Sequence, residues 1–149
     1  MNESQARVEL VQVLTRHHAM IQAYAYAIVR DFYLAANGGR PEKDRFVYSE
    51  QMCTIQEFLP IKHRRKGLTL EANLERVKSL LPDHLIPFAV DPGGDYFCFS
   101  TRLEEFGAIF AYRMDCHDKS KATKLLAASL TSLIGGLVTK AEAYKLLAG

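Results

Sequence analysis

The apolar positions near the start of the chain have the spacing of an amphipathic helix. Val8, Leu10, Val11 and Leu14 indicate a short first helix, and a longer apolar stripe follows it. The stripe recurs at every fourth residue, which places it on one face of a second helix. Its members are Met20, Tyr24, Ile28 and Phe32.

This second helix is expected to end at residue 35 or 36, where the chain composition changes. Asn37, Gly38 and Gly39 come next, and these residue types tolerate the left-handed backbone that is common at helix C-termini. Pro41 then adds a second helix-breaking signal.

The middle of the chain predicts a short strand, an ambiguous segment and a third helix. Arg45–Tyr48 has the composition of a strand, whereas 54–59 fits a strand or a helical turn equally well. Leu70, Leu74, Val77 and Leu81 then repeat with helical spacing. Thr69 can act as the N-cap of this helix, and Pro82 is expected to end it near residue 81.

From residue 85 the pattern becomes that of an antiparallel β-meander. Segments 86–90, 96–100 and 108–112 are predicted strands, and Asp91-Pro92-Gly93-Gly94-Asp95 is dense in turn residues. We expect Gly93 and Gly94 to permit a tight hairpin and Asp95 to hold it by accepting backbone N–H bonds. A further turn is expected near Gly107. Connections this short exclude parallel neighbours, which need a crossover of a dozen or more residues.

The last segment again has helical spacing from Ala122 to Ala148, with leucines at 126, 130, 133 and 137 on the predicted face. Gly135 and Gly136 should weaken or bend it, so one kinked helix or two shorter ones are both compatible with the pattern. The predicted fold class is therefore α+β: an antiparallel meander covered by N-terminal, middle and C-terminal helices.

Composition favours one ordinary globular domain spanning residues 1–149, since the chain is 48% hydrophobic and 24% charged. Three cysteines at unrelated spacings favour reduced thiols. The start of the sequence lacks the pattern of a secretory signal. The longest uncharged stretch, 125–139, is shorter than the ~20 apolar residues that span a bilayer. The expectation is a cytoplasmic protein without a membrane partner.

Charge is uneven along the chain. The net charge is +2, yet the run Lys62-His63-Arg64-Arg65-Lys66 alone carries four cationic residues, so the remainder is net −2. Lys62, Arg64, Arg65 and Lys66 could contact a polyanion. A solvated loop before the third helix explains the same run, and no aromatic residues are interleaved with it to stack on single-stranded bases.

Candidate catalytic and metal-binding groups do not form a recognised pattern. Asp115-Cys116-His117-Asp118 contains four possible ligands, but consecutive residues cannot all face one ion and the spacing matches no zinc motif. A polar loop, with Asp118 or Ser120 as a helix cap, is the simpler interpretation. Cys98 lies in an aromatic strand, which indicates a small core residue. Neither a phosphate loop nor a G-x-S-x-G motif is present. We expect no enzymatic activity, no cofactor and no metal.

Three spaced segments nevertheless resemble a known family. The helix ending at Asn37-Gly38-Gly39 is followed some forty residues later by Leu81-Pro82, and the chain then passes through Pro87 and Asp91 into Gly93-Gly94-Asp95-Tyr96. This order resembles the SUKH superfamily, which is named partly for fungal regulators of cell-wall glucan synthesis and is abundant in bacteria. The resemblance covers roughly residues 25–138.

The resemblance implies a non-enzymatic protein-binding module, with a bacterial immunity protein that occludes a toxin encoded nearby as the leading hypothesis. Regulatory or scaffold binding, as in the fungal relatives, and nucleic-acid binding through 62–66 are the alternatives. A contact surface is expected near the family-motif turns, although the same residues could serve only to define the fold. The motif positions are Asn37, Gly38, Gly39, Pro82, Pro87, Asp91, Gly93, Gly94, Asp95 and Tyr96.

Overall fold

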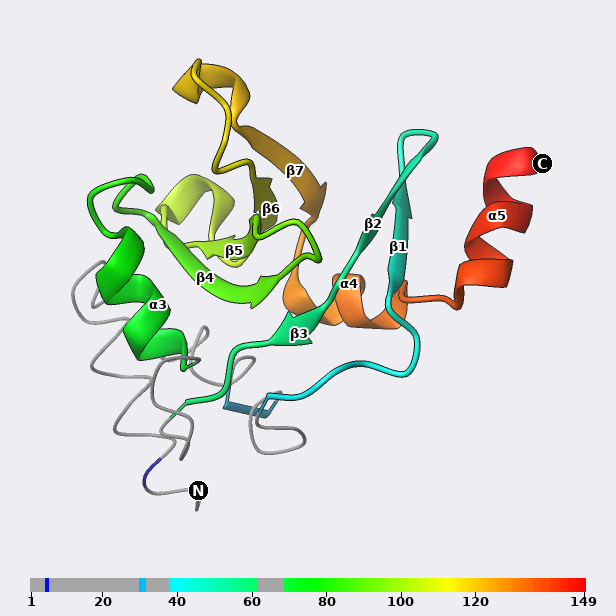
Figure 1. Ribbon diagram of the computed structural model, residues 1–149, viewed down its shortest axis with the longest axis horizontal. Coiled ribbons are helices and arrows are strands. Elements are labelled where there is room, and N and C mark those ends of the chain that lie inside the picture. Colours follow the sequence, from blue (N-terminus) through cyan, green and yellow to red (C-terminus); the bar gives the residue numbers. More distant parts are fainter. Residues whose placement is uncertain (1–4, 6–29, 32–37, 62–68) are drawn as a thin grey trace.

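A five-stranded antiparallel sheet with strand order β3-β4-β5-β6-β7 forms the centre of the molecule in the computed structural model (Figure 1). The structure describes residues 5, 30–31, 38–61 and 69–149. Residues 30–31 are helical and belong to the predicted second helix; the rest of that helix, the predicted first helix, Asn37 and the basic run 62–66 lie outside these residues. The sheet consists of β3 (Glu57–Phe58), β4 (Leu85–Val90), β5 (Tyr96–Ser100), β6 (Ile109–Tyr112) and β7 (Thr123–Ala127).

The predicted α+β meander is confirmed, and its turns show why it forms. Between β4 and β5, the Asp91 carboxylate accepts hydrogen bonds from the backbone N–H groups of Gly93 (2.9 Å) and Asp95 (2.8 Å). The prediction that Asp95 closes this hairpin was wrong. Asp91 has this role because it is placed at the start of the turn, as in an Asx-turn. Gly94 and Gly107 both have the positive φ that glycine adopts without a steric cost.

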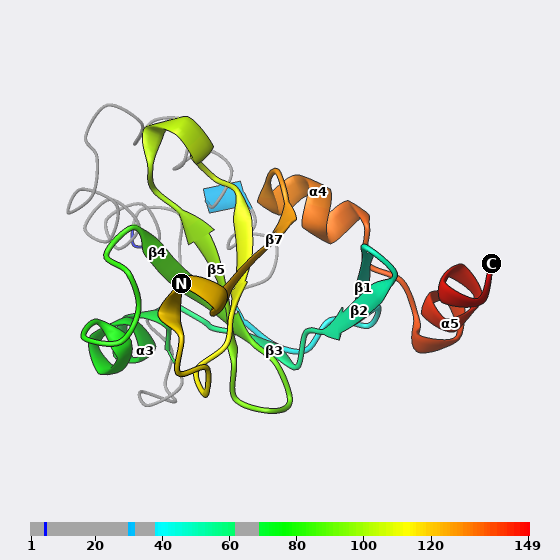
Figure 2. The same cartoon turned by 90° about the horizontal axis from the view of Figure 1, so that it is seen from above.

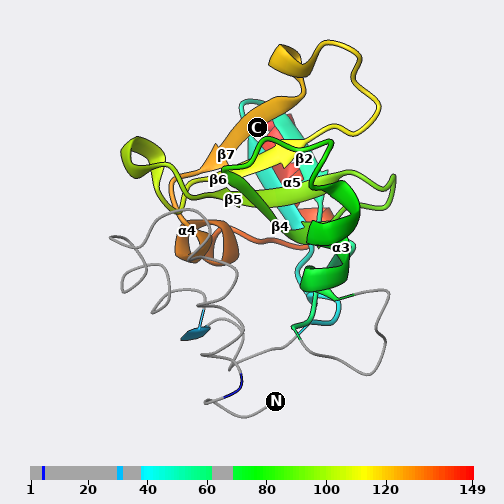
Figure 3. The same ribbon diagram turned by 90° about the vertical axis from the view of Figure 1, so that its left-hand side faces the viewer.

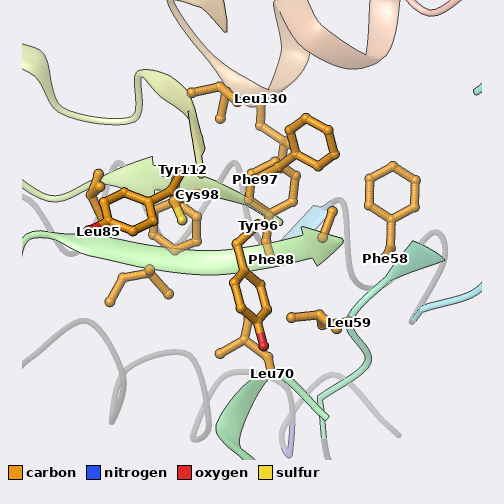
Figure 4. Close-up of a cluster of buried hydrophobic side chains, with 14 of the residues drawn as sticks. Phe58, Leu59, Leu70, Leu85, Phe88, Tyr96, Phe97, Cys98, Tyr112 and Leu130 are labelled. Carbon is orange, nitrogen blue, oxygen red and sulfur yellow. The ribbon is translucent and has the colours of Figure 1, made fainter. Parts of the chain in front are cut away.

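Strand alternation sends neighbouring side chains of β5 to opposite faces of the sheet. Figure 4 shows Tyr96 directed toward Leu70, while Phe97 lies on the side of Leu130. Leu70 begins helix α3 (Leu70–Val77), and Leu130 begins helix α4 (Leu130–Gly135). The two helices therefore bury different faces of the sheet.

Aromatic side chains fill much of the core. The Phe88 ring centroid lies 6.4 Å from that of Phe58 and 6.2 Å from that of Phe99. These distances fall in the usual range for aromatic pairs. Because the three rings come from β3, β4 and β5, they tie the short edge strand β3 to the sheet centre.

Helix α3 begins where its sequence predicts. The Thr69 side chain accepts a hydrogen bond from the Ala72 N–H at 3.1 Å, which confirms the N-cap. The regular helix ends at Val77 rather than near 81. Leu81 still donates its N–H to the Val77 carbonyl at 2.9 Å, so a final turn carries the chain to Pro82.

A separate two-stranded hairpin, β1 (Arg45–Tyr48) and β2 (Gln51–Thr54), stands beside the main sheet (Figure 1). The strand prediction for 45–48 is thus confirmed, and the ambiguous segment 54–59 contains β3. Arg45 and Val138 exchange backbone hydrogen bonds of 3.0 and 2.8 Å, which root the hairpin. Helix α5 (Lys140–Ala148) packs on β1 and stands apart from the main sheet, as Figure 2 shows.

The predicted helix from Ala122 to Ala148 was wrong over 123–127, where the chain forms β7 instead. Strand β6 has one side paired with β5, and β7 supplies the partner for the other side. The pairing still buries Ala122 and Leu126. Two shorter helices follow, and α4 ends at Gly135 with Gly136 as its C-cap. Tertiary pairing outweighed the helical spacing of the leucines because it satisfies the open backbone edge of β6.

Candidate functional site

A groove of about 320 Å³ lies between the β1–β2 hairpin and one end of the main sheet. The hairpin provides one wall, and the β4–β5 turn with the adjoining ends of β5 and β6 provides the other. The lining residues are Tyr48, Met52, Cys53, Thr54, Asp91, Pro92, Asp95, Tyr96, Phe97, Ala111, Tyr112 and Arg113.

The two carboxylates of the groove hold its wall in place. The Asp91 carboxylate closes the β4–β5 turn through the two backbone N–H groups described above. The Asp95 carboxylate accepts a third, from Met114 at 2.9 Å, and so joins this turn to the segment that leaves β6. The wall is therefore preorganised by charge-assisted hydrogen bonds.

The hairpin wall is fastened to β7 by one lysine. Lys124 Nζ lies 4.9 Å from the centroid of the Tyr48 ring and donates a hydrogen bond of 2.7 Å to Gln51 Oε1. The position of the ammonium over the ring is that of a cation–π interaction. Burial raises the pKa of the Tyr48 hydroxyl, and the nearby Cys53 adds to this shift. Tyr48 is thus neutral at physiological pH.

The cysteines of this region have the properties of structural residues. Burial raises the pKa of the Cys53 thiol to about 12, and burial also raises the pKa of Cys98. A thiol with a raised pKa has little of the reactive thiolate form at neutral pH. Cys98 is fully buried, which confirms the predicted core position.

The structure brings only part of the predicted motif surface together. Asp91, Asp95 and Tyr96 line the groove. Gly39 lies elsewhere, in an isolated bridge with Phe58 at the β3 edge. Gly38 and Gly39 have φ values of +92° and +86°, and a Cβ on Gly38 would lie 2.8 Å from Pro60 Cβ. The left-handed backbone explains why glycine occupies both positions. At Gly38, the close approach of Pro60 is a second reason.

Two motif residues that the sequence offered as possible contact positions are buried. Tyr96 is 7% exposed, and its hydroxyl donates a 2.7 Å hydrogen bond to Asn73 Oδ1. Pro87 is also fully buried. It lies inside β4, as the predicted strand 86–90 implies, at the point where the pairing with β5 shifts register between Pro87 and Ala89. A bulge accommodates proline in a strand because a regular ladder bond is already missing there.

Pro82 lies at a second, smaller groove of about 260 Å³ on the α3 side. Its apolar floor includes Leu74, Leu81 and Leu85, and the Lys78–Glu75 ion pair lies at its margin. Gly93 and Gly94 are exposed in the β4–β5 turn. The motif positions are therefore not one surface: they lie in the two grooves, at the β3 edge of the sheet, in the exposed β4–β5 turn and in the core.

The polar segment after β6 forms a connection between β6 and β7 that extends beyond the sheet (Figure 3). Within it, the Asp118 carboxylate accepts the Ser120 N–H at 3.1 Å, so Asp118 caps the short 3₁₀ helix η4 (Lys119–Lys121). The Cys116 thiol donates to the Asp118 carbonyl at 3.3 Å. Within the described ranges, no three His, Cys, Asp or Glu residues gather in a way that could hold a metal ion.

Sequence reasoning did not anticipate the hairpin wall of the groove. Arg45–Tyr48 was identified as a strand, but its partner strand 51–54 was not. The two-residue connection Ser49-Glu50 lacks the Asn-Gly or Asp-Gly that signals a tight hairpin. The contact with Lys124 could not be inferred locally because it joins residues 73 positions apart.

A comparison with models of known protein families shows to which family the chain belongs. The model described as SMI1 / KNR4 family (SUKH-1) matches residues 27–136. The chain belongs to this family. The match agrees with the range of about 25–138 expected from the motif order, and it includes both grooves and the β1–β2 hairpin. No curated protein shows significant similarity to this SUKH-1 chain. None of the helices in the described part is both long and apolar enough to cross a membrane.

Proposed function

We propose that this SUKH-1 chain is a non-enzymatic binding protein that neutralises a protein toxin by occlusion, with the groove between the two hairpins as part of its contact surface. SUKH membership supports a role as a toxin-immunity or regulator-like binder. The observation that carries the proposal is the preorganised groove wall. Its two carboxylates accept three backbone N–H bonds and keep the β4–β5 turn in one arrangement.

Preorganisation favours binding by occlusion because less conformational freedom is lost when the partner docks. The groove is also amphipathic: aromatic and aliphatic side chains from both walls accompany Asp91, Asp95 and Arg113. A mixture of apolar surface with a few fixed polar groups is typical of protein–protein contact surfaces. Occlusion needs only such a surface, and no chemical step by this chain.

The raised pKa of Cys53, the thiol in the groove, also supports binding rather than catalysis. At pH 7 this cysteine is almost entirely protonated, and a protonated thiol is a poor nucleophile. The groove carboxylates are bound to backbone N–H groups of their own loops. We therefore assign these side chains to maintaining the shape of the surface.

Coexpression with the product of the adjacent gene tests the proposal. If that product is toxic alone, coexpression of this chain should restore growth, and the purified proteins should form a complex. As a matched control, Leu85→Asp introduces a charge into the buried core and should abolish protection by unfolding the chain. An adjacent product that is neither bound nor neutralised would contradict the proposal. If it is bound but harmless on its own, the regulatory or scaffold alternative is favoured.

A further inference from the structure

The turn that joins β1 to β2 has a backbone conformation that its residues rarely adopt. Tyr48 pairs with Gln51, so Ser49 and Glu50 alone form the connection. Their φ values are +43° and +63°. Positive φ at both central residues is the type I′ pattern, for which Asn-Gly is strongly preferred. Serine and glutamate are strained there because a Cβ approaches the neighbouring carbonyl group.

Neither side chain compensates for this strain by contacts within the fold. Ser49 and Glu50 are both exposed, and neither makes a hydrogen bond or ion pair to any residue that the structure describes. A strained position that lacks a local benefit is a reason to look for a function. The side chains of Ser49 and Glu50 are therefore the candidates for that function.

The turn is presented on a rigid support. At its base, Arg45 exchanges two backbone hydrogen bonds with Val138, and a Cβ on Gly136 would lie 2.8 Å from the Phe46 ring. Beside the turn, Lys124 holds both Tyr48 and Gln51. Figure 1 shows the hairpin beside the main sheet, with its turn at the end away from β3, and Tyr48, Met52, Cys53 and Thr54 of the hairpin line the groove. A partner in the groove would therefore meet Ser49 and Glu50 in a fixed position.

The charges of the groove and of the turn, taken together, favour a cationic group on that partner. Asp91 and Asp95 line the groove, and Glu50 adds a third carboxylate at the turn. The guanidinium of Arg113 lies 3.8 Å from the carboxylate of Asp115, which offsets its charge. Lys124 contributes one cation, directed onto the Tyr48 ring. The excess of carboxylates would attract and orient a lysine or arginine.

We propose that the β1–β2 turn is a contact element of this protein and that Glu50 pairs with a lysine or arginine on the protein bound in the groove. This inference rests on the proposed function, because it assigns part of the same binding surface. It names Glu50 as a contact residue and predicts a positive charge on the partner. It also gives a reason for the strained backbone at Ser49 and Glu50.

The test compares three variants for binding to the purified product of the adjacent gene. Ser49→Asn/Glu50→Gly installs the preferred turn and removes both side chains. Glu50→Gln removes only the charge. Glu104→Gln is the matched control, since Glu104 is an exposed acid in the β5–β6 connection, at the opposite end of β5 from the groove. Binding is measured by calorimetry, and Tm is measured for every variant.

The double variant should raise Tm by about 3 °C, because the strained residues are replaced by ones that accept positive φ. Its Kd should nevertheless rise by about tenfold or more, and Glu50→Gln should weaken binding in the same direction and increasingly as salt is lowered. Glu104→Gln should bind like the wild type. A double variant that binds as tightly as the wild type, or that gains no thermal stability, overturns the inference alone. A wild-type chain that does not bind overturns the proposed function, and this inference with it.

Discussion

The buried hydrogen-bond network between Tyr96 and α3 yields a quantitative prediction. Tyr96 donates to Asn73 Oδ1 at 2.7 Å, and Asn73 Nδ2 donates to the Thr69 carbonyl at 2.8 Å. Both Tyr96 and Asn73 are buried, so a group deprived of its partner here has little access to water. Arg76 Nη1 also donates to Asn73 Oδ1, at 3.1 Å.

The two single substitutions should differ in cost. Tyr96→Phe removes one hydrogen bond while Asn73 keeps Arg76 as a donor, so the free energy of unfolding should fall by about 1 kcal/mol. Asn73→Ala removes all three hydrogen bonds of the amide and leaves the Tyr96 hydroxyl buried without its acceptor. We expect a loss of about 3 kcal/mol. That loss corresponds to a Tm decrease of about 6–12 °C for a chain of this size.

The double variant provides the decisive measurement. Asn73→Ala/Tyr96→Phe should cost about 2 kcal/mol instead of the roughly 4 kcal/mol of simple addition, because no hydroxyl is left unsatisfied. Urea unfolding of all four proteins, with unchanged m-values, gives the coupling energy. Additivity within about 0.5 kcal/mol would refute the network.

Three further predictions concern a glycine pair, the alkaline limit of stability and the basic run. Gly38→Ala should reduce the free energy of unfolding by about 2 kcal/mol or more, because the new Cβ is strained by the positive φ and also clashes with Pro60. Gly39→Ala should reduce it by only about 1 kcal/mol, because its Cβ has the same kind of backbone strain but meets open space. Equal costs in urea unfolding would contradict the close approach at Gly38. The Cys53 pKa of about 12 exceeds the ~8.5 of an unfolded cysteine, so above about pH 8.5 the unfolded state loses a proton that the native state keeps. Stability should therefore fall as pH rises from about 8.5 toward 12, less steeply in Cys53→Ala, as urea midpoints at pH 8 and 10 would reveal. If the basic run binds a polyanion, Arg64→Ala/Arg65→Ala should weaken RNA or DNA binding and reduce its salt dependence, whereas undetectable binding by the wild type at low salt would remove that alternative.

Local sequence signals were sufficient for much of the fold. Thr69 caps α3 as predicted because a side-chain hydroxyl can satisfy an N–H group only a few residues away. The dense turn between β4 and β5 and the glycine at 107 required antiparallel neighbours, and the meander follows from them. These features depend on interactions between residues close in the chain. The motif order extended this reasoning to the correct family.

Only the tertiary structure decided the elements whose stability depends on distant partners. Residues 123–127 have helical spacing, yet they form β7 because β6 presents an edge with unpaired backbone groups. Tyr96 lies in a predicted strand next to a turn, and only the fold shows that its hydroxyl is buried and bonded to Asn73 on α3. The groove likewise depends on contacts between residues distant in sequence, since Val138 and Lys124 hold the β1–β2 hairpin beside the main sheet. The sequence thus determined the local turns, the caps and the antiparallel succession of β4, β5 and β6, while long-range contacts determined β7 and which side chains became surface.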